Sequence, residues 1–93
     1  MLVIAHHDIS DPENFWNAAG EVTKNLPANL RLHSVYPSQD GKAGTCIWEA
    51  TNAETVQEFL DKNAGQYARN TCYALNVEKA MGLPKIELAE ELN

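Results

Sequence analysis

The sequence predicts an α+β sandwich in which a four-stranded antiparallel sheet carries two helices on one face. Two observations predict it: the expected elements follow the order strand, helix, strand, strand, helix, strand, and the 93 residues leave little length beyond them. A chain of this size forms one domain around one core. We expect this domain to span residues 1–84 and an acidic tail to follow at 85–93.

The first strand is expected at residues 2–9, where the initial side chains are apolar on both faces, as in strands that are covered on both sides. The first helix is expected at 11–26. Asp11 can cap it, and Pro12 suits its first turn. Its apolar stripe has helical spacing and comprises Phe15, Ala19, Val22 and Leu26.

The next two strands are expected at 30–36 and 44–50, joined by a polar, glycine-containing hairpin loop. A register with Tyr36 opposite Gly44 gathers apolar side chains on one face and forms a cross-strand ion pair on the other. In that register the residues that face the helices are Leu30, Leu32, Cys46 and Trp48, and those that face away are Arg31, His33, Val35, Ile47 and Glu49.

The second helix is expected at 53–64, after a capping box formed by Thr51 and Glu54. The last strand is expected at 71–77, where the side chains alternate with a period of two. Residues 66–70 then form a connector, with Tyr67 packed beneath it. The resulting order, βαββαβ, is that of the ferredoxin-like fold.

In length, pattern and element order, residues 2 to about 80 resemble the dimeric α+β barrel superfamily. This group includes antibiotic-biosynthesis-monooxygenase-like proteins, muconolactone isomerase-like proteins and small stress-responsive barrel proteins. The resemblance implies a homodimer in which two sheets pack face to face with the helices outside. In the monooxygenase relatives, a cavity between sheet and helices holds an aromatic substrate that is oxidised without a metal or a flavin.

The residues agree with a homodimer. Two helices on one face of a sheet leave the other face uncovered, and the expected register places the apolar Val35 and Ile47 there. An exposed apolar sheet face usually marks an interface. We expect it to bury on the order of 800 Å² on each partner.

The charge balance disfavours two classes of partner. Thirteen acidic residues against seven Lys and Arg give a formal charge of −6, and no basic stripe is present. The phosphate-neutralising attraction that dominates nucleic-acid binding is therefore missing, as is attraction to an anionic membrane surface. No stretch approaches the roughly 20 apolar residues of a membrane span. We expect neither nucleic acid nor membrane as a partner.

Cysteine usage indicates a reduced, cytoplasmic protein. The apolar start ends at His6, too early for the apolar region of a secretory signal, and only Cys46 and Cys72 are present. We expect both to be small buried hydrophobic residues. Nucleophilic catalysis by either is disfavoured, because no basic neighbour that would lower the thiol pKa is evident in the sequence.

His6 and His7 are the candidates for acid–base catalysis, because imidazole titrates near neutral pH. Neighbours on a strand point to opposite faces, so one is expected toward the helices and the other toward the open face. The alternative is that both are polar ends of a strand with no ligand.

A ligand pocket for a small apolar or aromatic molecule is expected to involve His7, Cys46, Trp48 and Tyr67. The alternative for Trp48 is an ordinary core position. His33 and Glu49, with a first-strand histidine, form a weaker candidate site for a divalent metal, or else the polar rim of a dimer interface. No glycine-rich phosphate loop is present, and no cofactor is expected.

Three functions remain open. The first is binding of a small molecule in an apolar pocket. The second is cofactor-independent catalysis of a monooxygenase or isomerase type, with His6 or His7 as acid or base. The third is binding of a divalent metal.

Overall fold

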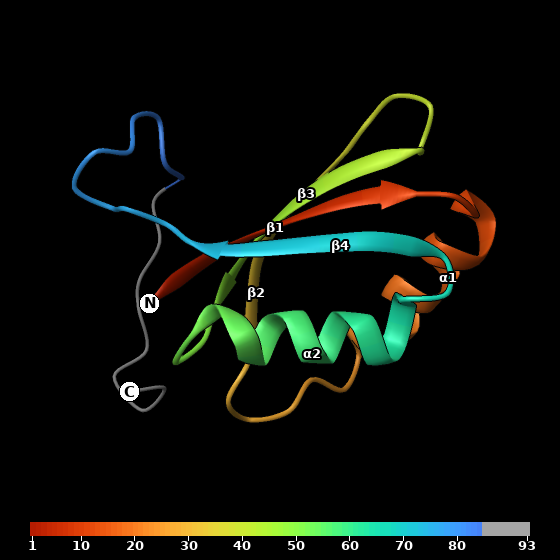
Figure 1. The fold of residues 1–93 in the computed structure, drawn as a ribbon, viewed down its shortest axis with the longest axis horizontal. Coiled ribbons are helices and arrows are strands. Elements are labelled where there is room, and N and C mark those ends of the chain that lie inside the picture. Colours follow the sequence, from red (N-terminus) through yellow and green to blue (C-terminus); the bar gives the residue numbers. More distant parts are fainter. Residues whose placement is uncertain (85–93) are drawn as a thin grey trace.

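A computed structural model describes residues 1–84 and has the expected βαββαβ order. Its elements are β1 (Leu2–Ile9), α1 (Pro12–Val22), β2 (Arg31–Pro37), β3 (Ala43–Glu49), α2 (Ala53–Ala64) and β4 (Ala68–Ala74). The strands form one antiparallel sheet in the order β2-β3-β1-β4, and α2 runs along one of its faces (Figure 1). The α+β fold of ferredoxin-like type is confirmed. The acidic tail expected at 85–93 lies outside the described residues.

The core lies between the sheet and the helices and has two parts. The larger cluster is formed by Val3, Ala5, Leu30, Cys46, Trp48, Ala50, Val56 and Leu60. The smaller cluster, near the start of α1, is formed by Ile9, Phe15, Ala64 and Ala68. The helix-facing residues of β1 enter both clusters, because β1 is a central strand that has β3 on one side and β4 on the other.

Both helices begin at capping residues. The Asp11 side chain accepts a hydrogen bond from the backbone N–H of Asn14 at 3.2 Å, and Asn52, rather than the expected Thr51, caps α2. The first helix ends at Val22 and not at residue 26. The backbone N–H and the hydroxyl of Thr23 both donate to the carbonyl of Ala19, at 3.2 and 2.9 Å, which satisfies a last-turn carbonyl as the chain leaves the helix.

Strand β2 contains an irregularity that changes the face of its later residues. Up to Leu32 the pairing with β3 is as predicted, but Ser34 rather than His33 lies opposite Ile47. One extra residue in a strand reverses the alternation that follows it. Val35 therefore pairs with a helix-facing residue of β3, and its expected place on the open face was wrong.

Strand β4 starts at Ala68, earlier than the expected Thr71. It pairs with β1 in continuous register, with Ala68 opposite Ile9 and Asn70 opposite His7. Residues 68–70 pair with β1 in this register, so this part of the segment expected as a connector belongs to the sheet. This shift brings Asn70 into the interior.

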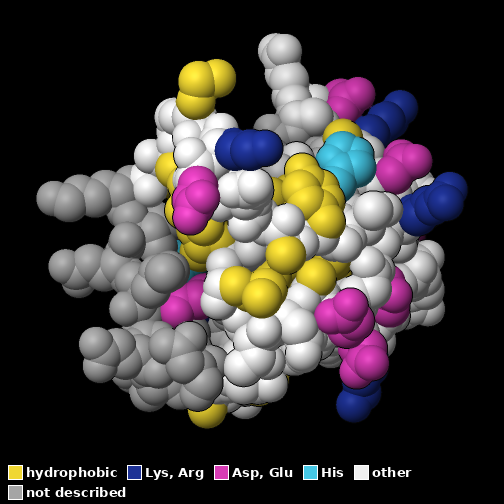
Figure 2. Space-filling view, turned by 60° about the vertical axis from the view of Figure 1, so that its left-hand side comes forward, with side chains coloured by type: hydrophobic (Ala, Val, Ile, Leu, Met, Phe, Trp, Pro, Cys, Tyr) yellow, Lys and Arg dark blue, Asp and Glu magenta, His cyan; other side chains and the backbone are white. Residues whose placement is uncertain are grey.

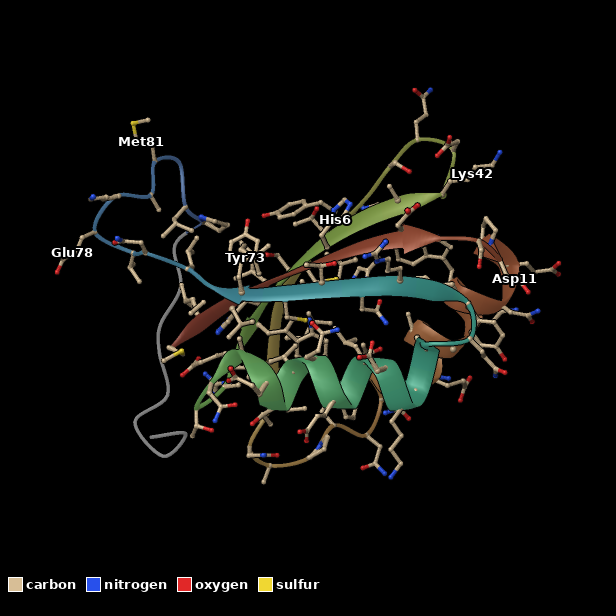
Figure 3. The ribbon with its side chains drawn as sticks, viewed as in Figure 1. His6, Asp11, Lys42, Tyr73, Glu78 and Met81 are labelled. Carbon is tan, nitrogen blue, oxygen red and sulfur yellow. The ribbon has the colours of Figure 1, made fainter. Side chains whose placement is uncertain are left out.

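The open face is the side of the sheet that carries no helix. In Figure 3 the side chains of His6 and Tyr73 extend from the face of the sheet opposite α2. Tyr36 and Tyr73 are 51% and 54% exposed, whereas Ile47 is buried, so the exposed apolar surface expected from Ile47 is instead aromatic. Across residues 1–84, no helix is long and apolar enough to cross a membrane.

Candidate functional site

The two neighbouring histidines of β1 lie in different environments. His7 faces the helices and is 1% exposed, while His6 is exposed on the open face. The alternation of side chains along a strand produces this separation, as expected. Only His7 reaches the interior.

A chain of hydrogen bonds runs from the surface to His7 and then to Cys46. Asn70 Nδ2 donates to Asp61 Oδ1 at 3.3 Å, so Asn70 Oδ1 is available as an acceptor and lies 2.7 Å from His7 Nδ1. The imidazole therefore carries its proton on Nδ1, and its Nε2 has a free lone pair. Cys46 Sγ lies 3.2 Å from this Nε2 and donates its thiol proton to it.

Four elements around β1 hold this chain in place. His7 on β1 lies between β3, which carries Cys46, and β4, which carries Asn70. The Gln57 side chain on α2 donates to the Asn70 carbonyl at 2.6 Å and also bonds the Asp61 carboxylate. The Phe15 ring of α1 covers the imidazole, with a centroid distance of 5.1 Å. The orientation of the imidazole is thus determined from several sides.

Burial keeps both members of the pair neutral. It lowers the pKa of His7 below its usual 6.5, although the hydrogen bond to Asn70 acts in the opposite direction and His6 adds a smaller lowering. It also raises the pKa of the Cys46 thiol to about 12, with a further contribution from Cys72. At neutral pH the site therefore holds a thiol and an uncharged imidazole.

A cavity lies between the sheet and the helices, beside this pair. Its space amounts to about 40 Å³. The side chains around it are His7, Phe15, Trp16, Ala19, Val22, Thr23, Leu32, Val35, Cys46, Trp48, Leu60, Asn63 and Ala64. The lining carries no aspartate, glutamate, lysine or arginine. The cavity is therefore suited to an uncharged, largely apolar molecule.

Three of the four expected ligand-binding residues meet at this cavity. His7, Cys46 and Trp48 line it, whereas Tyr67 packs against the smaller core cluster near the start of α1. The Tyr67 carbonyl accepts hydrogen bonds from the backbone N–H groups of Ser10 and Asp11. Tyr67 thus joins the start of β4 to the start of α1 and is not a residue of the cavity lining.

The partners of Cys46 are not evident from the sequence. His7 contacts this thiol across the β1–β3 pair, but burial raises the thiol pKa, so the imidazole does not lower it. Asn70 was missed since residues 66–70 were expected to form a connector. Buried and exposed residues alternate at the start of β4, where Ala68 and Asn70 are buried and Arg69 and Thr71 are exposed. This alternation is the one local signal for a strand that begins at Ala68.

One polar atom of the cavity residues has no hydrogen-bond partner in the described part of the chain. It is the indole Nε1 of Trp48, a residue only 2% exposed. A buried donor without an acceptor costs about 1–3 kcal/mol.

The expected metal-site residues His33 and Glu49 do come together. His33 Nε2 lies 2.8 Å from Glu49 Oε1, and Glu49 is 2% exposed. In β1 the residue opposite Glu49 is Leu2, four positions from His6, which is about 13 Å along a strand. No group of three or more metal-ligating side chains is found within residues 1–84.

A second hollow lies at the surface, near the outer end of the hydrogen-bond chain. It has a space of about 710 Å³ and is lined by Asp8, Ile9, Ser10, Asp61, Gly65, Ala68, Arg69 and Asn70. It is wide open to solvent, so it cannot exclude water from a bound molecule. The enclosed cavity at His7 and Cys46 is the better candidate site.

Comparison of the chain with protein-family models, curated proteins and solved structures finds no match.

Proposed function

We propose that this protein binds a small, uncharged, largely apolar molecule in the cavity between the sheet and the helices. One observation carries the proposal: the lining is mainly apolar, and its polar pair, His7 and Cys46, is held in a defined orientation. Small-molecule sites typically combine apolar walls with a few placed polar groups.

The resting space of about 40 Å³ is little more than the share of one water molecule in the liquid. A ligand of several atoms therefore enters only if cavity side chains move aside. Thr23, which caps the end of α1, and Val35 on β2 are the exposed residues of the lining. We expect entry between α1 and β2.

Toluene is a suitable probe because it is small, uncharged and apolar. We expect it to raise the melting temperature and to change the emission of Trp16 and Trp48, which both line the cavity. Ala19→Leu fills the cavity and should abolish these effects. Ala18→Leu, one position along α1 and outside the lining, should retain them. Absence of binding of toluene, benzene and indole to the unmodified protein would refute the proposal.

Acid–base catalysis on a bound molecule is the second candidate function. The observation that favours it is the inward His7, a lining residue that is neutral at pH 7 and has its Nε2 3.2 Å from Sγ of Cys46. His6, on the open face, does not line the cavity. Turnover of an aromatic substrate that is lost in His7→Gln and retained in His6→Gln would establish this function.

We further propose that the open face pairs with a second copy of the chain, as in the dimeric α+β barrel superfamily that the sequence resembles. Figure 2 shows hydrophobic side chains gathered near the centre of one face, with a histidine at their margin and charged side chains around them. The half-exposed rings of Tyr36 and Tyr73 belong to the open face, with His6 between their strands. Exposed aromatic residues are enriched at interfaces.

Light scattering at micromolar concentration tests this pairing. We expect the mass of a dimer for the unmodified protein and for Gln39→Lys, a change in the exposed hairpin loop. Tyr73→Lys places a charge on the open face and should give a monomer. A monomeric unmodified protein would rule out the dimer and would leave the proposed cavity function unaffected.

A further inference from the structure

We propose that Cys46, His7 and Asn70 form a nucleophilic site at the cavity wall, and that its substrate is a small, uncharged α,β-unsaturated compound. The proposal rests on the binding function above, since the electrophile must occupy the cavity. It adds a covalent step to that function.

The geometry is that of a nucleophile, a base and an orienting group. Sγ of Cys46 lies 3.2 Å from Nε2 of His7, and Nδ1 of His7 lies 2.7 Å from Oδ1 of Asn70. A nucleophile within hydrogen-bond reach of a base, with a third group that orients the base, is the recurring arrangement of nucleophilic catalysis. Asp61 extends the chain, because its carboxylate accepts from Asn70 and keeps the amide oxygen turned toward the imidazole.

The step is a conjugate addition. A bond forms between Sγ of Cys46 and the terminal alkene carbon, while the alkene electron pair moves to the carbon beside the electron-withdrawing group. The thiol proton passes to Nε2 of His7 and then to that carbon. No group leaves, and no oxidant, reductant or cofactor is needed, so atoms and electrons balance within the thiol and the substrate.

The cavity determines the class of substrate. Both Sγ and Nε2 belong to residues that line it, and the lining carries no aspartate, glutamate, lysine or arginine. An ionic electrophile would lose its hydration without gaining a counter-ion, which is strongly unfavourable. A neutral molecule of a few heavy atoms avoids this penalty and displaces the fewest side chains.

The resting protonation state defines how the rate depends on pH. Three titratable groups lie around His7: the Cys46 thiol on β3, His6 on the same strand, and Asp61 on α2. The Asp61 carboxylate reaches His7 only through Asn70, and the Phe15 ring of α1 adds no charge. Cys72 of β4 also acts on the Cys46 thiol. Because thiol and imidazole are both neutral at pH 7, the proton moves to Nε2 as the carbon–sulfur bond forms.

The decisive measurement is the rate at which acrylonitrile modifies Cys46 between pH 6.5 and 8.5, followed by intact mass in the Cys72→Ser background. We expect a rate that changes little over this range, because the neutral pair persists throughout it. A reaction through free thiolate would accelerate about tenfold per pH unit. That slope, or a failure of acrylonitrile to modify Cys46, would overturn the proposal.

Asn70→Ala tests the positioning residue, with Asn17→Ala on the exposed side of α1 as the control. We expect at least a tenfold lower rate at pH 7 for Asn70→Ala and a rate that rises with pH. The control should keep both the rate at pH 7 and a rate that changes little between pH 6.5 and 8.5. If the modification rate of Asn70→Ala still changes little with pH, the role of Asn70 as the orienting group is overturned. Binding of toluene without modification of Cys46 would overturn the nucleophilic site alone and leave the proposed function intact.

Discussion

The Nε2 atom of His7 lies 3.2 Å from Sγ of Cys46, yet burial holds the proton on sulfur. Proximity of a base is commonly associated with a lowered thiol pKa. Here the same burial raises the pKa of the thiol and lowers that of the imidazole, so an ion pair between them is disfavoured. The proton stays on sulfur and the imidazole stays uncharged, as they would for a hydroxyl group beside a neutral imidazole.

Iodoacetate should alkylate the native protein very slowly at pH 7. With the pKa of Cys46 raised to about 12 and that of Cys72 to about 11, the thiolate fraction of Cys46 is about one part in 100,000. The reagent is also charged and is excluded from the cavity. Mass spectrometry should show both thiols unmodified in native protein and both modified in urea. Rapid stoichiometric labelling of the native protein would contradict this expectation.

The free energy of unfolding should decrease as the pH falls below about 6.5, in part because of His7. Its pKa is lowered in the folded state, so the unfolded chain binds more protons between the two pKa values. The contribution of His7 is therefore fully present above pH 6.5 and is lost as the pH falls below it. Urea unfolding at pH 5.0 to 7.5 measures this slope. His7→Gln should flatten it and His6→Gln should not; equal slopes in the two variants would refute the assignment.

His33→Ala should destabilise the protein by about 1–3 kcal/mol, because the buried Glu49 carboxylate loses a hydrogen-bond partner at 2.8 Å. Arg31→Ala is the matched control. Arg31 lies 3.9 Å from the same carboxylate, with its side chain 46% exposed, so solvent screens its charge and we expect a smaller loss. Urea unfolding compares the two variants. A larger loss for Arg31→Ala than for His33→Ala would show that the bulged histidine is not the main partner.

Gly44→Ala should destabilise the protein by about 1–3 kcal/mol and alter the tryptophan emission. A Cβ at Gly44 would lie 3.1 Å from Cη2 of Trp16, whose Nε1 is bonded to the Gly41 carbonyl at 2.9 Å. Gly20→Ala is the control, because nothing lies within 4 Å of its added Cβ. Gly20 lies in the last turn of α1, where that change should stabilise by up to about 1 kcal/mol. Thermal unfolding with fluorescence detection separates the two effects. A neutral Gly44→Ala would mean that Trp16 can shift without loss.

Local patterns predicted the elements whose signals lie within a few residues of sequence. Strand β1 and helix α2 have the predicted bounds, since each is marked by a run of apolar positions with a capping residue or a break beside it. Two of the errors fall where a neighbouring strand decides. The β2 bulge at His33 turned Val35 inward, and pairing with β1 extended β4 back to Ala68.

In the candidate site, too, some residues were predictable from the sequence and others depended on the pairing of strands. His7, Cys46 and Trp48 were recognisable as candidates because their residue types suit a polar contact in an apolar pocket. The participation of Asn70 and Asp61 was not recognisable, because these residues lie about sixty positions from His7 and meet it only through the pairing of β4 with β1. The inward position of His7 rather than His6 was likewise undecided by two adjacent identical residues.

The sequence by itself determined the order of elements, the fold class and the acidic balance of the chain, since these depend on periodicity, capping residues and composition. The tertiary structure alone decided that an imidazole, a thiol and an amide meet at one cavity, and that burial keeps the first two uncharged. Side-chain contacts across strands depend on register, and a single extra or missing residue reverses the face that a side chain occupies. Protonation in turn depends on the surrounding dielectric, which exists only once the chain has folded.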